Sequence, residues 1–355
     1  MYVLNSKISI GGKRFDGVNE VEIVASGKVL QDTATIKVPT TARLERAGLL
    51  VSELPTVSAF VVGDDVTIEL GYNGVLKEEF RGFVRRIHPT TPLSIECEDA
   101  TFLLRKRTVN KSWQSVTLKQ VLVEILKNTG VTLAVEPPKI TFSQFYLRDV
   151  SPANALQEFI EKYGLTIYFT AFKKLFVGLA FDSEDRTTIK YDIGTNVIEN
   201  DLQTVDAADV QLRIKCIGIK PDGTKIIAEI GDGADPDVGL PKRKKKKGEV
   251  TVQKTVIKPD KSDGAEVRTL YFYNVHSKTE LLEIARADLR KRKFTGFKGG
   301  LTTFLLPYAK VGNVARLTDS FYPERGDGDY LIEKVTTTFG TSGARRKVEL
   351  GLKFK

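Results

Sequence analysis

The chain has 355 residues and a formal net charge of +9, and apolar residues make up 41% of it. This composition is typical of a globular protein with one to three domains and a sizeable core. No stretch approaches the roughly 20 consecutive apolar residues of a membrane span. The start at Met1–Lys7 has no apolar run after basic residues, so we expect no signal peptide. The chain should stay in the cytosol where it is made unless a larger assembly carries it out.

The positive charge is concentrated in one place. Six consecutive basic residues follow an acidic, glycine-rich loop at Gly231–Gly239, and removing them from the total of +9 leaves +3. Such a cluster is a candidate contact for phosphate, another polyanion or a partner, and the alternative is a solvated loop beside an acidic one. It contains no aromatic residue, so base stacking is not expected of it. Its members are Lys242, Arg243, Lys244, Lys245, Lys246 and Lys247.

Residues 1–105 are predicted to form a first β-barrel-like domain. Val66, Ile68 and Leu70 alternate with polar residues, which is the period of a half-buried strand. Similar short strands are separated by regular turn residues, as in a barrel or sandwich. The segment Thr41–Leu54 is less clear, and we consider it a candidate for a short helix.

In residues 106–186 helical patterns appear beside short strands, which indicates an inserted α/β domain. Thr117 followed by Gln120 is a capping-box pattern, and apolar residues at helical spacing come after it. Ser151 precedes a second helical stretch that should end at Gly164, because serine caps helix N-termini and glycine ends helices. Two short strands complete the insert.

Residues 187–355 return to strands and predict a second β-barrel-like domain, with a flexible acidic and basic loop near 231–248. A hairpin is expected about the turn Pro221-Asp222-Gly223. A long helix should begin near Ser277, which forms another capping-box pattern with Glu280. The expected fold class is therefore β-rich α+β, with two related β-barrel-like domains and a small α/β insert.

The end of the chain repeats a pattern from its first domain. Three-strand meanders at 61–97 and 311–350 share a Val-Gly-Asp/Asn-Val start, a glycine opening the second strand and a charged, amphipathic third strand. They lie about 245 residues apart, which predicts an internal duplication. The alternative is that two glycine-bounded β-meanders look alike without being repeats. A duplicated barrel would make a ring of three subunits look six-fold.

We find no catalytic or metal-binding pattern. Neither His88 nor His276 belongs to a recognisable motif, and the chain has no nucleophile elbow and no phosphate-binding loop. Cys97 and Cys216 each lie within alternating apolar residues, which favours buried free thiols over a disulfide. We therefore expect no enzymatic activity, no cofactor and no metal.

Several short segments follow one another in a characteristic order along most of the chain. None is diagnostic alone, and only their order and spacing together are specific. They are Phe80–Val84, Ile95–Asp99, Leu103-Leu104, Lys111–Trp113, Val116–Leu118, Ser151–Leu156, Tyr163-Gly164, Ile198–Leu202, Ala208–Val210 and Gly328-Asp329-Tyr330.

With these segments the chain resembles the baseplate hub proteins of contractile phage tails, the late control protein D family with the Mu-type tail hub. It is also similar to the N-terminal hub part of type VI secretion spike proteins. The resemblance implies two barrel-like hub domains per subunit and a homotrimer whose six barrels form a pseudo-six-fold ring. Such a ring would adapt a six-fold tail tube to a three-fold spike in the baseplate of a virion or injection machine, assembled in the bacterial cytoplasm.

The resemblance also implies partners. These are a tail spike protein and a tail tube or tube-initiator protein, with a tape-measure protein or DNA in transit through the channel as further candidates. The chain reaches Lys355 without a repetitive β-helical needle, so we expect the spike to be a separate protein. The resemblance does not explain the run Lys242–Lys247. The alternative function is a cytosolic nucleic-acid-binding protein acting through this basic loop.

Overall fold

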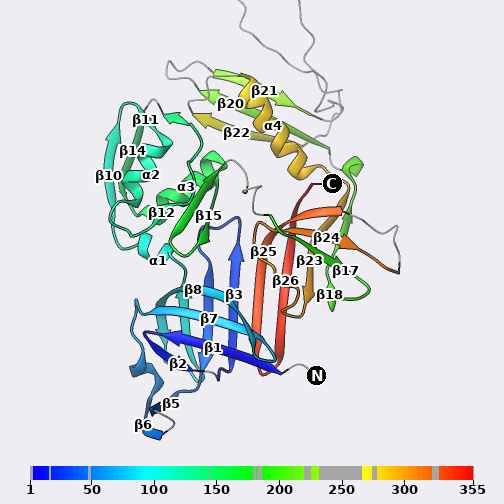
Figure 1. Ribbon diagram of the computed structural model, residues 1–355. Helices are drawn as coiled ribbons and strands as arrows, with labels where there is room; N and C mark the ends of the chain where they lie inside the picture. Colours follow the sequence, from blue (N-terminus) through cyan, green and yellow to red (C-terminus); the bar gives the residue numbers. More distant parts are fainter. Residues whose placement is uncertain are drawn as a thin grey trace, which may run out of the picture.

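The computed structural model is a β-rich α+β fold, which confirms the expected fold class (Figure 1). The basic run Lys242–Lys247 and most of the acidic loop before it lie outside the residues that the structure describes. The described residues are 3–15, 17–46, 49–142, 144–178, 181, 186–209, 211–219, 225–231, 266–273, 278–321 and 328–354.

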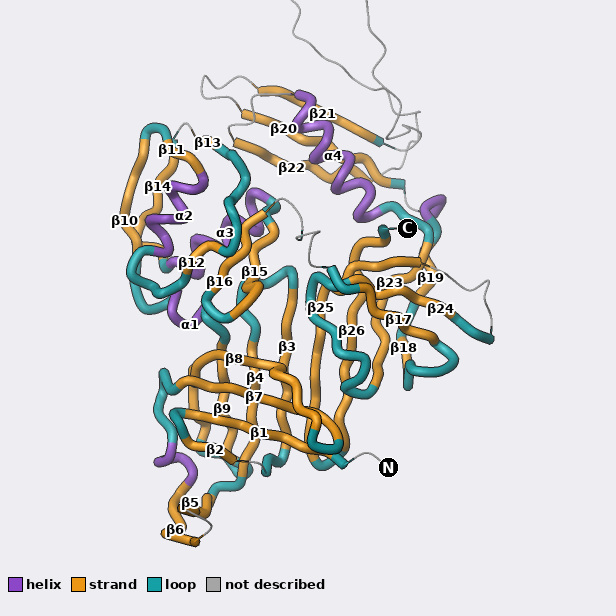
Figure 2. Tube along the Cα trace, in the orientation of Figure 1, coloured by secondary structure: helices purple, strands orange, loops and turns teal. Residues whose placement is uncertain are grey.

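One fourteen-stranded sheet runs through the molecule, and its N-terminal half folds back on itself as the first barrel. Figure 2 shows β1 and β7 crossing the direction of β3 and β4 at a steep angle. Buried residues on alternate positions of these strands, among them Ile8, Ile10 and Ile36, fill the interior. The strands of this half are β1 (Leu4–Ile10), β2 (Lys13–Phe15), β3 (Glu20–Ser26), β4 (Thr33–Val38), β7 (Asp65–Tyr72), β8 (Val75–His88) and β9 (Leu93–Glu98).

The C-terminal half of the same sheet surrounds a second core. Tyr191 and Tyr330 are fully buried there beside aliphatic residues such as Ile332 and Val348. Its strands are β17 (Thr188–Asp192), β18 (Glu199–Asn200), β19 (Gln203–Val205), β23 (Gly296–Thr303), β24 (Val314–Thr318), β25 (Gly328–Gly340) and β26 (Gly343–Lys353).

Both predicted meanders are confirmed as strands. β7, β8 and β9 form consecutive antiparallel pairs, and so do β24, β25 and β26. The strand beside each meander differs, because β1 pairs antiparallel with β7 whereas β17 pairs parallel with β24. The duplication itself stays a prediction.

The insert has its own core, and both of its longer helices begin where the sequence predicted, although α2 ends four residues before Gly130, the expected end. Thr117 and Gln120 form a reciprocal capping box at the start of α2 (Leu118–Leu126). Ser151 caps α3 (Pro152–Tyr163), which ends at Gly164 in the left-handed conformation. The remaining elements are α1 (Thr101–Leu104), β10 (Val109–Trp113), β11 (Val116–Thr117), β12 (Thr132–Leu133), β13 (Thr141–Phe142), β14 (Phe145–Val150), β15 (Thr166–Ala171) and β16 (Lys174–Gly178).

A small three-stranded sheet is separate from the large one, which the sequence analysis did not anticipate. It consists of β20 (Leu212–Ile219), β21 (Lys225–Ile230) and β22 (Glu266–Tyr273), and α4 (Lys278–Arg292) packs on it through residues such as Leu281 (Figure 1). The predicted hairpin is present as the antiparallel pair of β20 and β21. Ser277 lies outside the described residues, so its predicted cap stays a prediction. A short helical turn, η2 (Ala207–Asp209), precedes this sheet.

The expected helix within Thr41–Leu54 is wrong. The segment forms the hairpin of β5 (Thr41–Arg46) and β6 (Leu49–Pro55), followed by the single turn η1 (Thr56–Ala59). Figure 1 shows this hairpin projecting from the lower end of the first barrel. Alanine, leucine, glutamate and arginine are good helix formers, but strand pairing along the hairpin overrides that weak preference.

Gly82 permits a close approach that an alanine would prevent. A Cβ atom at Gly82 would lie 2.2 Å from the backbone oxygen of Glu98 on the neighbouring strand. We predict that Gly82→Ala lowers the free energy of unfolding by about 3 kcal/mol, because the paired strands must separate to admit the methyl group. Urea unfolding followed by circular dichroism measures this. Gly17→Ala is the control, since a Cβ there meets no atom within 4 Å, and an equal loss in both variants would contradict the prediction.

Candidate functional site

The two halves of the large sheet meet along one seam. β3 pairs antiparallel with β25 from Glu20↔Gly340 to Ser26↔Lys334. The first part of β25 instead pairs with β24, so this single strand belongs to both halves. Phe339 and Ala344, near the turn between β25 and β26, are buried in the core of the first barrel. The C-terminal hairpin is therefore shared between the two barrels.

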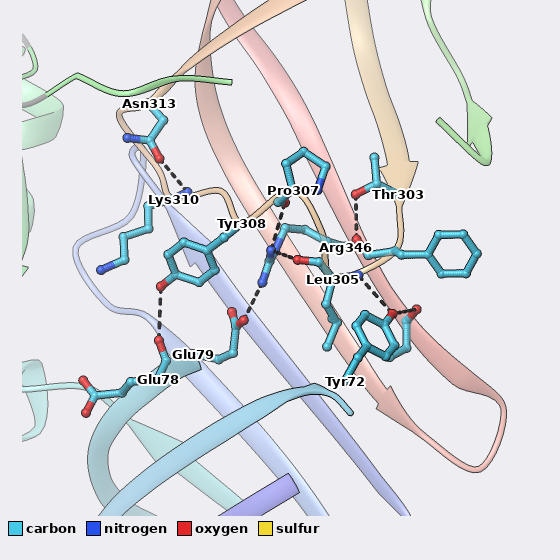
Figure 3. A network of polar contacts seen from close by, with 12 residues as sticks. Tyr72, Glu78, Glu79, Thr303, Leu305, Pro307, Tyr308, Lys310, Asn313 and Arg346 are labelled. Carbon is cyan, nitrogen blue, oxygen red and sulfur yellow. Dashed lines mark hydrogen bonds and ion pairs between the residues drawn. The ribbon is translucent and has the colours of Figure 1, made fainter. Parts of the chain in front are cut away.

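A buried arginine lies at the centre of the seam (Figure 3). Arg346 on β26 is fully buried, and its Nη2 lies 2.5 Å from Oε1 of Glu79 on β8. Its Nη1 donates to the carbonyl oxygens of Leu305 and Pro307, the latter at 3.1 Å. Its guanidinium also lies 4.9 Å from the centre of the Tyr308 ring. One side chain thus connects β8, β26 and the loop between β23 and β24.

The charges of this network depend on one another. Burial raises the pKa of the Glu79 carboxyl, and the adjacent guanidinium of Arg346 opposes that shift. A buried charge without a partner is strongly destabilising, whereas a buried pair with further hydrogen bonds is tolerated. The two carbonyl oxygens supply such bonds. The seam therefore has one favourable docked arrangement, because displacement by one strand position would separate the pair.

Two tyrosines extend the network in opposite directions. Tyr72 of the first barrel accepts a hydrogen bond from the Leu305 amide at 3.2 Å, and its hydroxyl lies 3.4 Å from the carbonyl oxygen of Ala344. Tyr308, which follows the second barrel's β23, donates to the carbonyl oxygen of Glu78 at 3.1 Å. Burial raises the pKa of Tyr308 to about 12, so its hydroxyl stays protonated and remains a donor.

A cavity of about 240 Å³ lies where the two barrels and the insert meet. Its wall includes Asp32, which follows β3, and Asp99, which follows β9. Asp99 accepts a hydrogen bond from the Thr101 amide at 3.0 Å, and Asp32 accepts one from the Ser26 amide at 3.2 Å. Burial raises the pKa of Asp99 to about 7. Burial and the neighbouring Asp99 carboxyl raise the pKa of Asp32 well above its usual range.

A larger cleft of about 920 Å³ lies between the insert, α4 and the second barrel. Charged side chains in its wall pair with one another. Lys28 lies 2.8 Å from Glu333, and Lys347 lies 2.7 Å from Asp201. These pairs connect the walls of the cleft and neutralise much of its charge.

The structure accounts for several residues that the sequence singled out. His88 pairs with Glu96 at 2.8 Å on the surface of the first barrel. Cys97 and Cys216 are buried free thiols, as predicted, and burial raises the pKa of Cys216 to about 12. His276 and the run Lys242–Lys247 lie outside the described residues.

The described part of the chain has neither a candidate metal site nor a membrane-spanning helix. It contains no cluster of three or more histidine, cysteine or carboxylate side chains arranged to hold a metal ion. No helix in the same ranges is long and apolar enough to cross a membrane.

Sequence patterns did not predict the seam residues, although one signal was present. Ala344, Val348 and Leu350 point inward from β26, and Arg346 occupies the same inward phase between them. A charged residue on the apolar phase of a strand requires a buried partner. That partner, Glu79, lies 267 positions away in the sequence, so no local pattern identifies it.

Comparison with known proteins gives matches at the level of structure alone. No family model matches the sequence, and no curated protein matches it. The 43 kDa tail protein of prophage MuSo2 from Shewanella oneidensis is 13% identical, with a TM-score of 0.63, over 98% of each chain. The tail protein from Neisseria meningitidis MC58 is 13% identical, with a TM-score of 0.62, over 99% of this chain and 97% of that one.

A third match comes from a secretion machine. An Escherichia coli protein described as a component of the type VI secretion system is 10% identical, with a TM-score of 0.57. The match covers 98% of this chain and 77% of that chain. At these identities the comparison shows the fold. The chain has the fold of phage tail proteins, as the resemblance in the sequence predicted.

The first prediction for this site concerns the buried ion pair. Arg346→Met should lower the free energy of unfolding by about 3–5 kcal/mol, because it leaves the Glu79 carboxylate buried without its partner. The double variant Arg346→Met, Glu79→Leu should lose less than the sum of the single losses, with a coupling of about 0.5–3 kcal/mol. Urea unfolding of the four proteins gives these values.

The control for the ion pair lies on the same hairpin. Lys334 pairs with Glu349 at 2.7 Å, but its side chain is 37% exposed. Lys334→Met should therefore cost at most about 1 kcal/mol. A cost for Arg346→Met that is no larger than this would show that the seam does not depend on the buried pair.

The second prediction concerns pH. The pKa of Asp99 is about 7 in the folded chain, above the value of about 3.9 for an exposed aspartate. The folded protein therefore binds this proton more tightly than the unfolded chain does. The tighter binding of this proton stabilises the folded protein. This stabilisation is complete below about pH 4 and is lost as the pH rises through about 7. The free energy of unfolding should fall over this window.

Asp99→Asn isolates this effect, because the amide oxygen can still accept from the Thr101 amide. We expect the variant to lose less stability than the wild type between pH 5 and pH 8, by about 1 kcal/mol or more. Denaturant unfolding at both pH values measures the difference. Parallel pH profiles for the two proteins would contradict the assignment.

Proposed function

We propose that this chain is a structural, non-enzymatic baseplate hub of a phage tail or of a related contractile injection machine. The single observation that supports this most directly is the shared hairpin of β25 and β26, which joins two barrels into one sheet. The fold shared with phage tail proteins supports the same class of role.

The proposed mechanism is symmetry matching. In this proposal residues 1–105 and 187–355 are the two hub domains and residues 106–186 are an insert on the first. Three copies place six barrels in a closed ring, with three-fold symmetry in sequence and approximate six-fold symmetry in shape. Such a ring offers a six-fold surface to a tail tube on one side and a three-fold surface to a spike on the other.

The rigidity of the seam suits this role. A ring that transmits force between tube and spike requires two barrels with a fixed relative orientation. Seven paired positions between β3 and β25 and the buried pair of Arg346 and Glu79 would hold that orientation. The partners in this proposal are a second and third copy of the chain, a spike protein and a tube or tube-initiator protein. Assembly takes place in the bacterial cytoplasm, and the mature location is the baseplate.

The alternative function is nucleic-acid binding through Lys242–Lys247. It rests on composition, since the run carries six of the nine net positive charges. Replacing all six residues by serine separates the two proposals. Salt-sensitive binding to DNA that disappears in this variant favours the alternative, and a trimeric mass that the variant retains favours the hub.

The test of the hub is the native mass in solution, measured by light scattering and native mass spectrometry at moderate salt. We expect a mass three times that of the chain, because the ring closes with three copies. If the chain is monomeric alone, it is measured again with the candidate spike protein. A monomer under both conditions would overturn the proposed ring.

A further inference from the structure

Three phenylalanines from three different elements form a row where the first barrel meets the insert. The rings of Phe102 on α1 and Phe83 on β8 stack at 5.4 Å with an angle of 23°. The ring of Phe172, in the turn between β15 and β16, lies 5.8 Å from that of Phe83. All three rings are partly exposed. The row therefore joins the insert to the barrel and also forms part of the surface.

Three positive charges lie over the faces of these rings. The Lys106 ammonium is 4.7 Å from the centre of Phe102, and the Arg81 guanidinium is 4.5 Å from that of Phe172. The Lys173 ammonium is 5.9 Å from Phe83 and 5.1 Å from Phe172. Cation–π attraction holds each charge in place. Within the described ranges, no carboxylate forms an ion pair with any of the three charged groups.

The backbone at Lys173 adds to this observation. Its φ is +63°, in the left-handed region where glycine is far more favourable than lysine. A glycine at position 173 would form the same turn at a lower conformational energy. The Lys173 ammonium instead lies over two rings, in line with the other two charges.

The loop before β7, which contains two exposed valines, approaches the same row of rings at Gly63. Val61 and Val62 are 63% and 60% exposed in the loop before β7. Gly63, the next residue, lies against Phe102, since a Cβ at this glycine would be 3.9 Å from the ring. We call the whole set the basic–aromatic surface, and its members are Val61, Val62, Arg81, Phe83, Phe102, Lys106, Phe172 and Lys173.

We propose that the basic–aromatic surface binds an acidic segment of a partner protein that carries apolar residues at one end. The three cations, which form no ion pair with a described carboxylate, favour an anionic partner, and the exposed valines that precede Gly63 in the chain fit its apolar end. Aromatic residues and arginine are enriched at protein interfaces. This proposal rests on the geometry of the surface and does not depend on the formation of a ring.

The same geometry argues against a nucleic acid at this surface. Binding of single strands relies on bases that stack on free aromatic faces. Here the faces are covered by one another and by the cations. A phosphate backbone would also leave Val61 and Val62 without apolar contacts.

The test uses the full chain and three fluorescein-labelled probes at moderate salt. The probes are a peptide of two leucines followed by six glutamates, a peptide of six glutamates alone, and an oligonucleotide of eight thymidines. Fluorescence anisotropy gives each dissociation constant. We expect the leucine-containing peptide to bind most tightly of the three.

The charge-reversal variant Arg81→Glu, Lys106→Glu, Lys173→Glu should weaken binding of that peptide by about tenfold or more. The matched control is Lys77→Glu, Arg148→Glu, Lys190→Glu, which changes the net charge equally at exposed sites elsewhere. It should change the constant less than about twofold. Val61→Ser with Val62→Ser should weaken binding of the leucine-containing peptide and leave the all-glutamate peptide unaffected. Circular dichroism confirms that each variant is folded.

Three results would overturn the proposal. The first is the absence of peptide binding by the wild type. The second is equal weakening by the two triple variants, which would show that net charge alone attracts the peptide. The third is tighter binding of the oligonucleotide than of either peptide, with loss in the first triple variant, which would assign the surface to nucleic acid. The native mass of the chain enters none of these results, so the hub and this surface are tested separately.

Discussion

The structure depends on how two sheet edges are satisfied. An edge strand exposes unpaired amide and carbonyl groups, which either bind another strand or must be covered. In this chain the edge of the first barrel at β3 and the long strand β25 pair with each other. This pairing makes one continuous sheet from two barrels and buries part of the C-terminal hairpin in the N-terminal core.

Backbone pairing alone would allow the two strands to slide, because every register offers similar hydrogen bonds. Side chains at the seam remove that freedom. Arg346 has its favourable set of partners only when Glu79 and the carbonyl oxygens of Leu305 and Pro307 face it together. A buried ion pair of this kind contributes little net stability, but an arrangement that separates the two charges leaves each buried without a partner, which is strongly destabilising. We infer that the seam trades some stability for a single relative orientation of the barrels.

The insert contacts the first barrel through aromatic rings and through its own apolar core, which includes Leu30. It meets the first barrel through the phenylalanine row, and it borders the cavity that contains Asp32 and Asp99. Partly exposed aromatic rings, cations without an ion-pair partner among the described residues and buried carboxyls gather at this junction. Their concentration at this junction contrasts with the apolar interior of the barrels, and it is why we assign a binding role here and a scaffolding role to the seam.

The local structure follows from residues that are close together in the sequence. The capping box at Thr117 and Gln120, the cap at Ser151, the stop at Gly164 and the alternation through Val66–Leu70 depend on neighbours a few residues away, and the structure has them as predicted. The order of the short segments from Phe80–Val84 to Gly328-Asp329-Tyr330 was also sufficient for the resemblance to tail hub proteins. The hairpin at Thr41–Pro55 was misjudged, because its good helix formers hid the strand pairing.

The contacts between distant parts of the chain could be seen only in the folded molecule. The pairing of β3 with β25, the contact of Glu79 with Arg346 and the alignment of Phe83, Phe102 and Phe172 join residues far apart in the chain. Such contacts follow from burial of charge and from sheet edges, and neither leaves a periodic pattern in the sequence. For this reason the fold class was predictable, while the seam and the basic–aromatic surface were not.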